Sequence, residues 1–402
     1  MREAYRSYFV TALVAYWCIS PSTLVAAEPP VLVTEGFHLA YNLDHEAAIA
    51  KLTRAVQVYP DNPVTHRSLA AAVWLKLLFS RGTLLIDNYL TGSVSRPNGD
   101  LEPPPKELDQ LFENHIERAI ALSETAIQVA PQDANAHYEL GIAVGLAASY
   151  RASIRGQNFR ALRYAKRAYS AHQRVLELNP NRDDAKLLVG IYRYVVSTMP
   201  RLFRMMAYLV GFDGGKDEAI ALVRDAAAYP GETQAEAQFA LVLLLNRERQ
   251  YDQAQRFLKQ LRRAYPRNRL VWLETASTWL RDDRPAMAEL TLAHGFSQLQ
   301  GDDRTRMFGE DATWHLARGT ARVDLGLVDR ARADLSRAAH GDAPLWVTGR
   351  AQLGLGKIAD LEGSRQRARD YYRQSKSLCD TARDRRCEQA ADYYLDYPFT
   401  GS

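Results

Sequence analysis

The sequence has few of the residues from which catalytic and metal sites are usually built. Only three of its 402 residues are cysteine, no Cys-x-x-Cys pair occurs, and the nine histidines do not cluster at ligand spacing. It also lacks a Gly-x-Ser-x-Gly nucleophile elbow and a complete phosphate loop. We therefore expect no catalytic residues, no metal, no cofactor and no enzymatic activity.

A long block of charge of one sign is also missing. The net charge is only +4, and only nine of the 51 basic residues are lysine. The arginines alternate with acidic residues, as in the runs 281–284 and 383–386. This pattern is typical of a solvated surface rather than of a basic patch for nucleic acid. We expect no nucleic-acid partner.

Long hydrophobic runs are absent except near the N-terminus. A basic start is followed by a nearly unbroken apolar run over residues 8–19 and by small residues at 25–27. These are the three parts of a secretory signal, so we predict a signal peptide over residues 1–27 with cleavage before Glu28. The run is too short to span a bilayer comfortably, and an uncleaved anchor is the alternative.

The cysteine in this leader does not make the protein a lipoprotein. Cys18 follows Tyr16 and Trp17, so the small residue expected just before a lipidated cysteine is missing. We expect a periplasmic or secreted protein.

Two cysteines remain after the leader, Cys379 and Cys387. An even pair suggests a disulfide in an oxidising compartment. Within one straight helix their Cα atoms would lie about 12 Å apart, which is too far for the bond. A disulfide therefore requires a turn within 380–386 that links two antiparallel helices, and two free buried thiols are the alternative.

Five prolines mark the organisation of the chain. Each follows an apolar pattern of helical spacing and precedes a polar turn, which predicts corners between helices. The last two prolines are 36 residues apart, and larger spacings before them indicate inserted segments. The five are Pro60, Pro131, Pro180, Pro230 and Pro266.

Small and bulky residues recur at fixed positions within these units. The chain resembles the tetratricopeptide repeat family, with small residues at repeat positions 8 and 27, alanine at 20, a bulky residue at 24 and proline at 32. About eight units of this type would cover the chain after residue 27. The first unit has Gly36, Ala48, Leu52, Ala55 and Pro60, and a late unit has Gly319, Ala331, Leu335 and Ala338.

The resemblance implies an all-α fold, a right-handed superhelical solenoid of antiparallel helix pairs. Residues 28–234 are expected to form an irregular array, with inserts in 73–119, 147–166 and 194–215. We expect the second insert to lengthen helices. Residues 235–376 form a more regular array, and residues 377–402 a C-terminal capping segment.

Two segments, 74–90 and 199–212, are strongly apolar with one or two arginines each. We interpret them as long buried helices. The alternative is a hydrophobic tunnel or a membrane-facing surface, because basic residues beside a large apolar face suit a bilayer interface. The residues of this apolar insert surface would be Phe203, Met205, Met206 and Tyr208.

In tetratricopeptide proteins the first helices of successive units line a concave groove, which typically binds an extended peptide or a partner helix. The resemblance places six candidate partner-binding residues there. Such a groove is part apolar and part basic, and it would suit a peptide with an acidic flank. The six are Phe239, Asn246, Arg247, Arg281, Arg350 and Lys357.

Two functions follow as hypotheses. The first is an exported scaffold for protein–protein interaction in the cell envelope, with a protein or peptide partner. The second is a periplasmic ligand- or lipid-binding helical protein, similar to the partner of tripartite substrate-binding transporters. That partner is usually a lipoprotein, and the missing lipidation signal makes the second hypothesis the weaker one.

Overall fold

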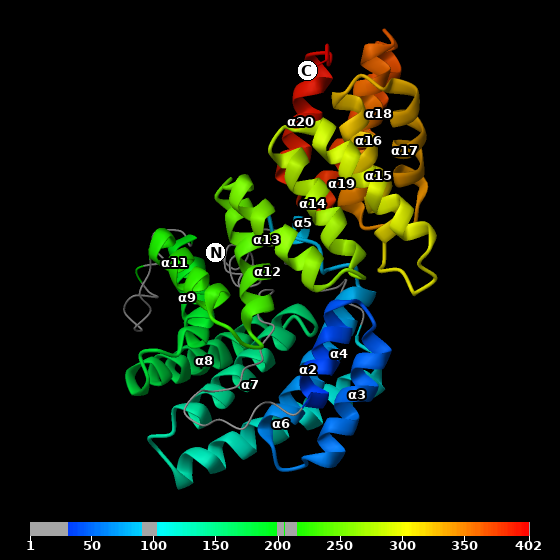
Figure 1. The fold of residues 1–402 in the computed structure, drawn as a ribbon. Helices are drawn as coiled ribbons and strands as arrows, with labels where there is room; N and C mark the ends of the chain where they lie inside the picture. Colours follow the sequence, from blue (N-terminus) through cyan, green and yellow to red (C-terminus); the bar gives the residue numbers. More distant parts are fainter. Residues whose placement is uncertain (1–30, 91–102, 199–204, 206–214, 402) are drawn as a thin grey trace. The chain divides into compact units, whose positions relative to one another are not determined.

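The computed structural model describes residues 31–90, 103–198, 205 and 215–401, except for the side chains of 158 and 159. All regular structure in these ranges is helical (Figure 1). The chain divides into two compact units. Unit 1 comprises residues 1–77, 94–244 and 263–267, and unit 2 comprises 78–93, 245–262 and 268–402.

Unit 1 is built from consecutive helix pairs. The pairs α2–α3, α6–α7, α7–α8 and α9–α11 pack against each other along the chain. Its helices are α2 (Val31–Tyr41), α3 (His45–Val58), most of α4 (Pro63–Ser80), α6 (Lys106–Val129), α7 (Ala134–Ser153), α8 (Asn158–Leu178), η1 (Asp183–Ala185), α9 (Lys186–Thr198), α11 (Lys216–Ala228) and most of α12 (Gln234–Arg247).

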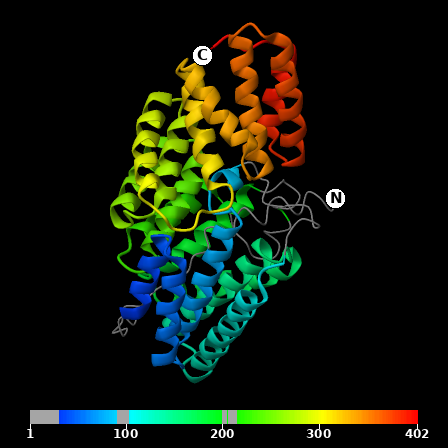
Figure 2. The ribbon, with the colours of Figure 1, turned by 90° about the vertical axis from the view of Figure 1, so that its right-hand side faces the viewer.

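Unit 2 repeats the same construction in the pairs α14–α15, α16–α17 and α18–α19, and the members of each pair lie side by side in both ribbon views (Figure 2). Its helices are α5 (Asp87–Leu90), most of α13 (Tyr251–Ala264), α14 (Arg269–Arg281), α15 (Pro285–Gln300), α16 (Glu310–Asp324), α17 (Val328–His340), α18 (Leu345–Leu361), α19 (Arg365–Thr381) and α20 (Arg385–Asp396).

The proline corners are confirmed. Each of the five helices α3, α6, α8, α11 and α13 ends two residues before its proline. A proline disfavours the helical conformation of the residue before it and cannot donate a backbone hydrogen bond, so these helices stop there.

Close contact within the helix pairs explains the small residues of the repeat. A Cβ atom at Gly36 would lie 2.5 Å from Cγ of Leu52, and one at Gly319 would lie 2.6 Å from Cγ of Leu335. These are repeat positions 8 and 24 in a unit 1 pair and in a unit 2 pair. Any larger residue at either glycine would push the two helices apart.

The second insert lengthens helices, as predicted. Helices α7 and α8 have 20 and 21 residues, and they are separated by a short turn in which Gly156 has φ +65°. A positive φ is readily adopted only by glycine, so the one glycine of this insert marks the corner.

The first apolar segment is a helix only in part. Helix α4 buries Trp74, whose indole nitrogen donates to Oγ of Ser153 at 2.9 Å, but it ends at Ser80. Gly82 follows with φ +69°, and helix resumes only at Asp87. The prediction of one long helix over 74–90 is therefore wrong after Ser80, because the glycine turns the chain.

The last helix pair carries a disulfide. Cys379 in α19 and Cys387 in α20 are bonded, with their Cα atoms 5.8 Å apart. The turn between the helices covers 382–384, within the predicted range, and Oδ1 of Asp384 accepts a hydrogen bond from the backbone of Cys387 at 3.3 Å. The turn brings the two thiols together.

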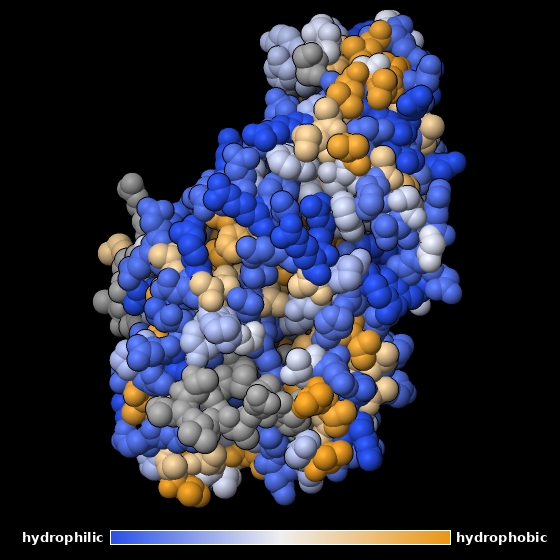
Figure 3. Space-filling view, viewed as in Figure 1, coloured by the Kyte–Doolittle hydropathy of each residue, from blue (hydrophilic) through white to orange (hydrophobic). Residues whose placement is uncertain are grey.

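Among the described residues, no helix is both long enough and apolar enough to cross a membrane. Hydrophilic side chains cover most of the face seen in Figure 3, and apolar ones show there in smaller separate groups.

Candidate functional site

A short folded segment of unit 2, residues 82–90, lies at the centre of the candidate site. Nδ2 of Asn88 donates to the backbone oxygens of Gly82 and Leu85 at 3.1 and 3.2 Å, and Oη of Tyr89 donates to the oxygen of Thr83 at 2.5 Å. Leu85 and Tyr89 are buried. The segment thus presents two apolar anchors with Asp87 between them, and we call it the Asp87 segment.

Three arginines from three helices hold this segment. Oδ2 of Asp87 accepts from Nη2 of Arg281 at 2.6 Å, and Oδ1 accepts from Nη1 of Arg350 at 2.8 Å. Nη1 of Arg247 donates to the backbone oxygen of Tyr89 at 2.7 Å. We call Arg247, Arg281 and Arg350 the arginine cluster. The three arginines lie in α14, in α18 and at the end of α12, where residues 245–247 belong to unit 2. The sequence predicts all three as partner-binding residues.

Further polar groups fix the orientation of the cluster. Nη1 of Arg281 donates to Oε1 of Glu274 at 2.7 Å and to Oδ1 of Asn246 at 2.8 Å. Nε of Arg350 donates to Oδ2 of Asp384 at 2.6 Å. Guanidinium groups held in this way lose little freedom when they bind a carboxylate, so the site is preorganised.

The electrostatics favour a charged carboxylate in this place. Burial acts to raise the pKa of Asp87, but the nearby guanidinium groups of Arg281 and Arg350 hold it at about 2. Glu274 shows the contrast, because burial raises its pKa despite its contact with Arg281. Asp87 therefore stays ionised near neutral pH.

The other predicted groove residues do not all join this site. Asn246 does, through Arg281 and through a hydrogen bond from its Nδ2 to Oγ1 of Thr278 at 3.2 Å. Phe239 belongs to unit 1, where its ring centre lies 6.1 Å from that of Tyr41.

Lys357 points to another part of unit 2. Its Nζ lies 4.8 Å from the ring centre of Phe399 and 5.5 Å from that of Tyr394. Burial lowers its pKa, although Asp324 acts against this. These aromatic contacts belong to the C-terminal segment rather than to the arginine cluster.

The predicted apolar insert surface is largely outside the described residues. Phe203, Met206 and Tyr208 are outside them, whereas Met205 is described and 64% exposed. Its exposure is compatible with a surface position.

Asp87 is not among the residues predicted from the sequence, because 74–90 is interpreted there only as an apolar segment. The signal is present: Asp87 is the one acidic residue in a run that is otherwise rich in leucine. A lone acid in such a run needs a buried cation, and three candidate arginines were available elsewhere in the chain.

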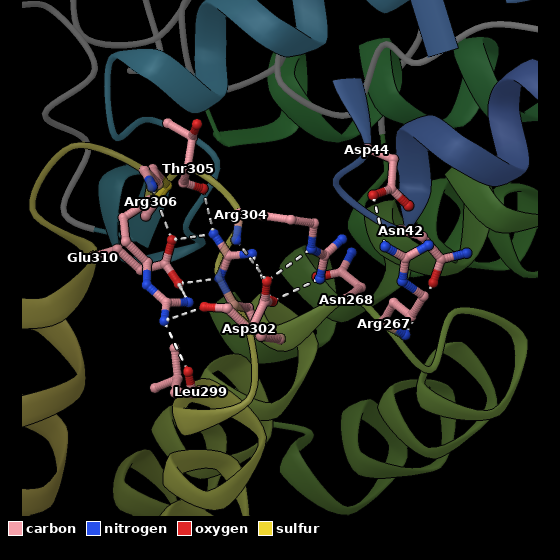
Figure 4. Close-up of polar contacts among 12 residues, drawn as sticks. Asn42, Asp44, Arg267, Asn268, Leu299, Asp302, Arg304, Thr305, Arg306 and Glu310 are labelled. Atoms are coloured by element: carbon pink, nitrogen blue, oxygen red, sulfur yellow. Dashed lines mark hydrogen bonds and ion pairs between the residues drawn. The ribbon is translucent and has the colours of Figure 1, made fainter. Parts of the chain in front are cut away.

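A second arginine-centred network in unit 2 fixes the loop between α15 and α16 (Figure 4). The buried Arg269 donates from Nε to Glu310 at 2.5 Å, from Nη1 to Asp302 at 3.0 Å and from Nη2 to the oxygen of Thr305 at 2.8 Å. Arg304 also binds Asp302. Arg269 and Arg304 are both paired with acidic side chains, so the network serves to hold the loop.

Unit 1 has its own polar link between turns, drawn in the same figure. Nη2 of Arg267 donates to Oδ1 of Asp44 at 2.9 Å, and its backbone nitrogen donates to Oδ1 of Asn42 at 3.0 Å (Figure 4). This joins the turn after α2 to the chain that follows α13.

Buried acids with little cationic support also lie in unit 1. Glu236 is 1% exposed and accepts from Oη of Tyr41, while its other oxygen has no hydrogen-bond partner. The buried Arg67 is paired with Glu139, from Nη2 to Oε1 at 3.1 Å and through Nε. Burial raises the pKa of Glu236 well above its usual value, and that of nearby Glu232 to about 7.

Comparisons with known proteins give only distant structural similarity. No family model and no curated protein sequence matches the chain. Similar solved structures include YrrB, described as a TPR protein with an unusual peptide-binding site, at 14% identity and a TM-score of 0.34 over 56% of this chain and 99% of that one.

Two further structures cover more of the chain. A tetratricopeptide repeat protein from Parabacteroides merdae is 15% identical with a TM-score of 0.33, over 81% of this chain and 97% of that one. The human IFIT1 dimer with m7Gppp-AAAA is 14% identical with a TM-score of 0.44, over 97% and 85%. The chain has a tetratricopeptide-like, all-α fold, and the ligands of these proteins are not transferred to it.

Proposed function

We propose that this protein is an exported interaction scaffold, and that unit 2 binds a protein segment through the helix faces that carry the arginine cluster. One observation carries the proposal. Side chains from α12, α14 and α18 converge on a piece of polypeptide and bind its carboxylate and its backbone. A surface that binds a side-chain carboxylate together with main chain suits peptide recognition.

The chemistry of the cluster argues for binding rather than catalysis. Guanidinium groups remain protonated at any physiological pH and bind carboxylates in fixed geometry, but they supply no nucleophile or base. Their acidic neighbours Glu274 and Asp384 are hydrogen-bonded to the same arginines. The cluster thus performs recognition in this proposal.

Export is proposed on two grounds. The first 27 residues have the three parts of a secretory signal. The disulfide of Cys379 and Cys387 suits an oxidising compartment. Fractionation of cells with N-terminal sequencing should find a chain that begins at Glu28 outside the cytoplasm, and a cytoplasmic chain that retains its first residues would contradict export.

Crosslinking and pull-down of the mature protein from its native envelope tests the binding function. One defined protein should be recovered with the wild type and lost with the double variant Arg281→Gln/Arg350→Gln. Arg373→Gln is the matched control, because that side chain is 58% exposed and its ion pair with Asp370 lies at the surface. Circular dichroism should show that both variants remain helical.

The alternative hypothesis predicts a different result. A lipid or small molecule that copurifies with the protein, with no protein partner in the crosslinks, would favour a ligand-binding protein and contradict the scaffold.

A further inference from the structure

The arginine cluster is occupied by the protein's own chain. The Asp87 segment lies outside the helix pairs of the repeat, and it reaches the cluster from the connection that follows α4. It uses the contacts that a bound peptide would use: one carboxylate, one backbone oxygen and two buried apolar side chains, Leu85 and Tyr89.

We propose that residues 82–90 are an internal ligand that closes the arginine cluster, and that the partner is a protein segment of the same chemistry. Such a segment has one acidic side chain, with an apolar residue two positions before it and an aromatic residue two positions after it. This inference rests on the proposed binding function, and it names the partner class and the way in which binding is regulated.

The acidic side chain is the most demanding part of this chemistry. Arg281 and Arg350 are held by Glu274 and Asp384 so that one donor of each points to the same carboxylate. If the Asp87 segment left without replacement, both donors would lose a charged partner in a largely buried place. Only a segment that brings another carboxylate restores those bonds, so neutral or basic segments are excluded.

The spacing of the apolar residues supplies the second criterion. Leu85 and Tyr89 are 5% and 1% exposed, so both residues are almost fully buried when Asp87 is bound. Tyr89 also folds the segment back, because its hydroxyl donates to the oxygen of Thr83. A partner with an aromatic residue at this position can adopt the same compact turn.

Covalent attachment gives the internal ligand an advantage over a free peptide. A tethered segment acts at an effective concentration of about a millimolar. A partner of equal intrinsic affinity therefore binds measurably only at comparable concentration, or after the Asp87 segment has left. The tethered segment thus sets a minimum partner concentration for binding.

The test replaces the internal ligand in the full chain and supplies it from outside. In one variant residues 83–90 become eight alternating glycine and serine residues. The probe is a fluorescent peptide with the sequence of residues 82–90, acetylated and amidated so that it has no terminal charges, and fluorescence anisotropy measures its binding. Circular dichroism establishes that the variant is folded.

The expected result has three parts. The linker variant binds the peptide at least about tenfold more tightly than the wild type, because competition by the tethered segment is gone. A peptide with asparagine in place of the aspartate binds the variant about thirtyfold more weakly or worse, because Arg281 and Arg350 lose the carboxylate that they share. Arg281→Gln/Arg350→Gln in the linker variant removes binding, whereas Arg373→Gln does not.

Three outcomes overturn the inference. The first is a folded linker variant that does not bind the aspartate peptide. The second is equal binding of the aspartate and asparagine peptides. The third is a wild type that dimerises with concentration and becomes monomeric when the peptide is added, which would assign the segment to a second copy.

A second variant covers the case in which the linker variant unfolds. Asp87→Asn keeps the size and the shape of the side chain but removes the charge, and it should bind the aspartate peptide with intermediate affinity. If this variant folds and does not bind, or if both variants unfold, the segment is a fixed part of unit 2 and the proposal fails.

Failure of this inference is distinguishable from failure of the proposed function. The peptide experiment needs no natural partner, whereas the pull-down does. If a partner is lost with Arg281→Gln/Arg350→Gln but the peptide experiment is negative, only the internal-ligand inference is contradicted. If the peptide experiment is positive but no protein partner is recovered, the proposed function is contradicted.

Discussion

Units 1 and 2 share the packing of their helix pairs, but two of their buried acid clusters differ in electrostatics. In the unit 2 cluster, arginines surround the acid. Asp334 accepts from His315 at 2.7 Å, from Arg318 at 2.7 Å and from Arg322 at 2.6 Å. Burial acts to raise its pKa, but these groups, with His315 and Arg318 foremost, hold it at about 2. The pKa of Asp87, which the arginine cluster binds, is lowered to about 2 in the same way.

In unit 1, Glu232 and the buried Glu236 have raised pKa values, so protonation rather than a nearby cation neutralises them. Burial raises the pKa of Glu232 to about 7, and for the same reason the pKa of Glu236 is raised well above its usual value. Arg67 acts against both shifts but is itself committed to Glu139. The Glu232–Glu236 cluster of unit 1 therefore favours protonated carboxyl groups, whereas Asp334 and Asp87 of unit 2 are held charged by arginines.

The two arrangements give opposite dependence on pH. A carboxyl whose pKa is lowered on folding stabilises unit 2 above the unfolded value of 3.8, and this stability is lost as the pH falls towards 2. A carboxyl whose pKa is raised stabilises unit 1 below the unfolded value of 4.5, and this stability is lost as the pH rises towards the folded value.

The largest expected loss of stability comes from removing a carboxylate that arginines surround. Asp334→Ala leaves Arg318 and Arg322 without their shared carboxylate in a mostly buried place, and it should lower the free energy of unfolding of unit 2 by about 3 kcal/mol. Hydrogen exchange of peptides from α16 and α17, followed by mass spectrometry, measures the loss. Below the unfolded pKa the difference from the wild type should shrink.

The control for this variant is Asp342→Ala in the same unit, because Asp342 is exposed and should change little. An equal loss for the two variants, or a loss from Asp334→Ala that does not depend on pH, would show that the carboxylate is not the stabilising element.

The next effect concerns the packing that the units have in common. Gly36→Ala in unit 1 and Gly319→Ala in unit 2 should each lower stability by about 1–3 kcal/mol, because the added methyl group would lie within 3 Å of a buried leucine. The local loss should be alike in the two units and independent of pH. Gly301→Ala serves as the control, since nothing lies within 4 Å of its added Cβ atom and its φ is −96°.

The same residues show how far sequence reasoning reaches. Gly36 and Gly319 each contact a residue of their own repeat, and each of the five prolines ends a helix of its own repeat. Spacing along the chain is therefore enough to predict these features. Arg281 and Arg350 are also predicted as residues of one face, because repeat positions place them there. Local signals thus predict the fold and half of the site.

The other half depends on residues that are distant in sequence. Asp87 lies 194 residues from Arg281 and 263 from Arg350, and no local pattern connects them. The raised pKa of Glu236 depends on burial that only the packed helices create, and the hydrogen bond from Tyr41, 195 residues away, acts against it. Periodicity predicts which face a residue occupies, but it does not predict which inserted segment covers that face.

The last effect is absent near pH 4.5 and grows only as the pH rises, and it tests the comparison of the two clusters at one side chain. Glu236→Gln keeps an oxygen to accept from Tyr41 and removes the group that ionises. Above pH 4.5 the wild-type glutamate ionises more readily in the unfolded chain, so the variant should become the more stable protein. The gain should approach about 1.4 kcal/mol per pH unit and level off near the folded pKa.

Hydrogen exchange of peptides from α2 and α12 at pH 4 to 8 measures this gain, because the two proteins share the same intrinsic exchange rate at each pH. His115 and His172 in unit 1, whose pKa burial lowers to about 4, act in the opposite direction, so the difference between the variant and the wild type is the informative quantity. Glu35→Gln is the matched control, since Glu35 is exposed. A gain from Glu236→Gln that stays constant from pH 4 to 8 would mean that Glu236 is already charged in the folded protein, and the contrast with Asp334 would then fail.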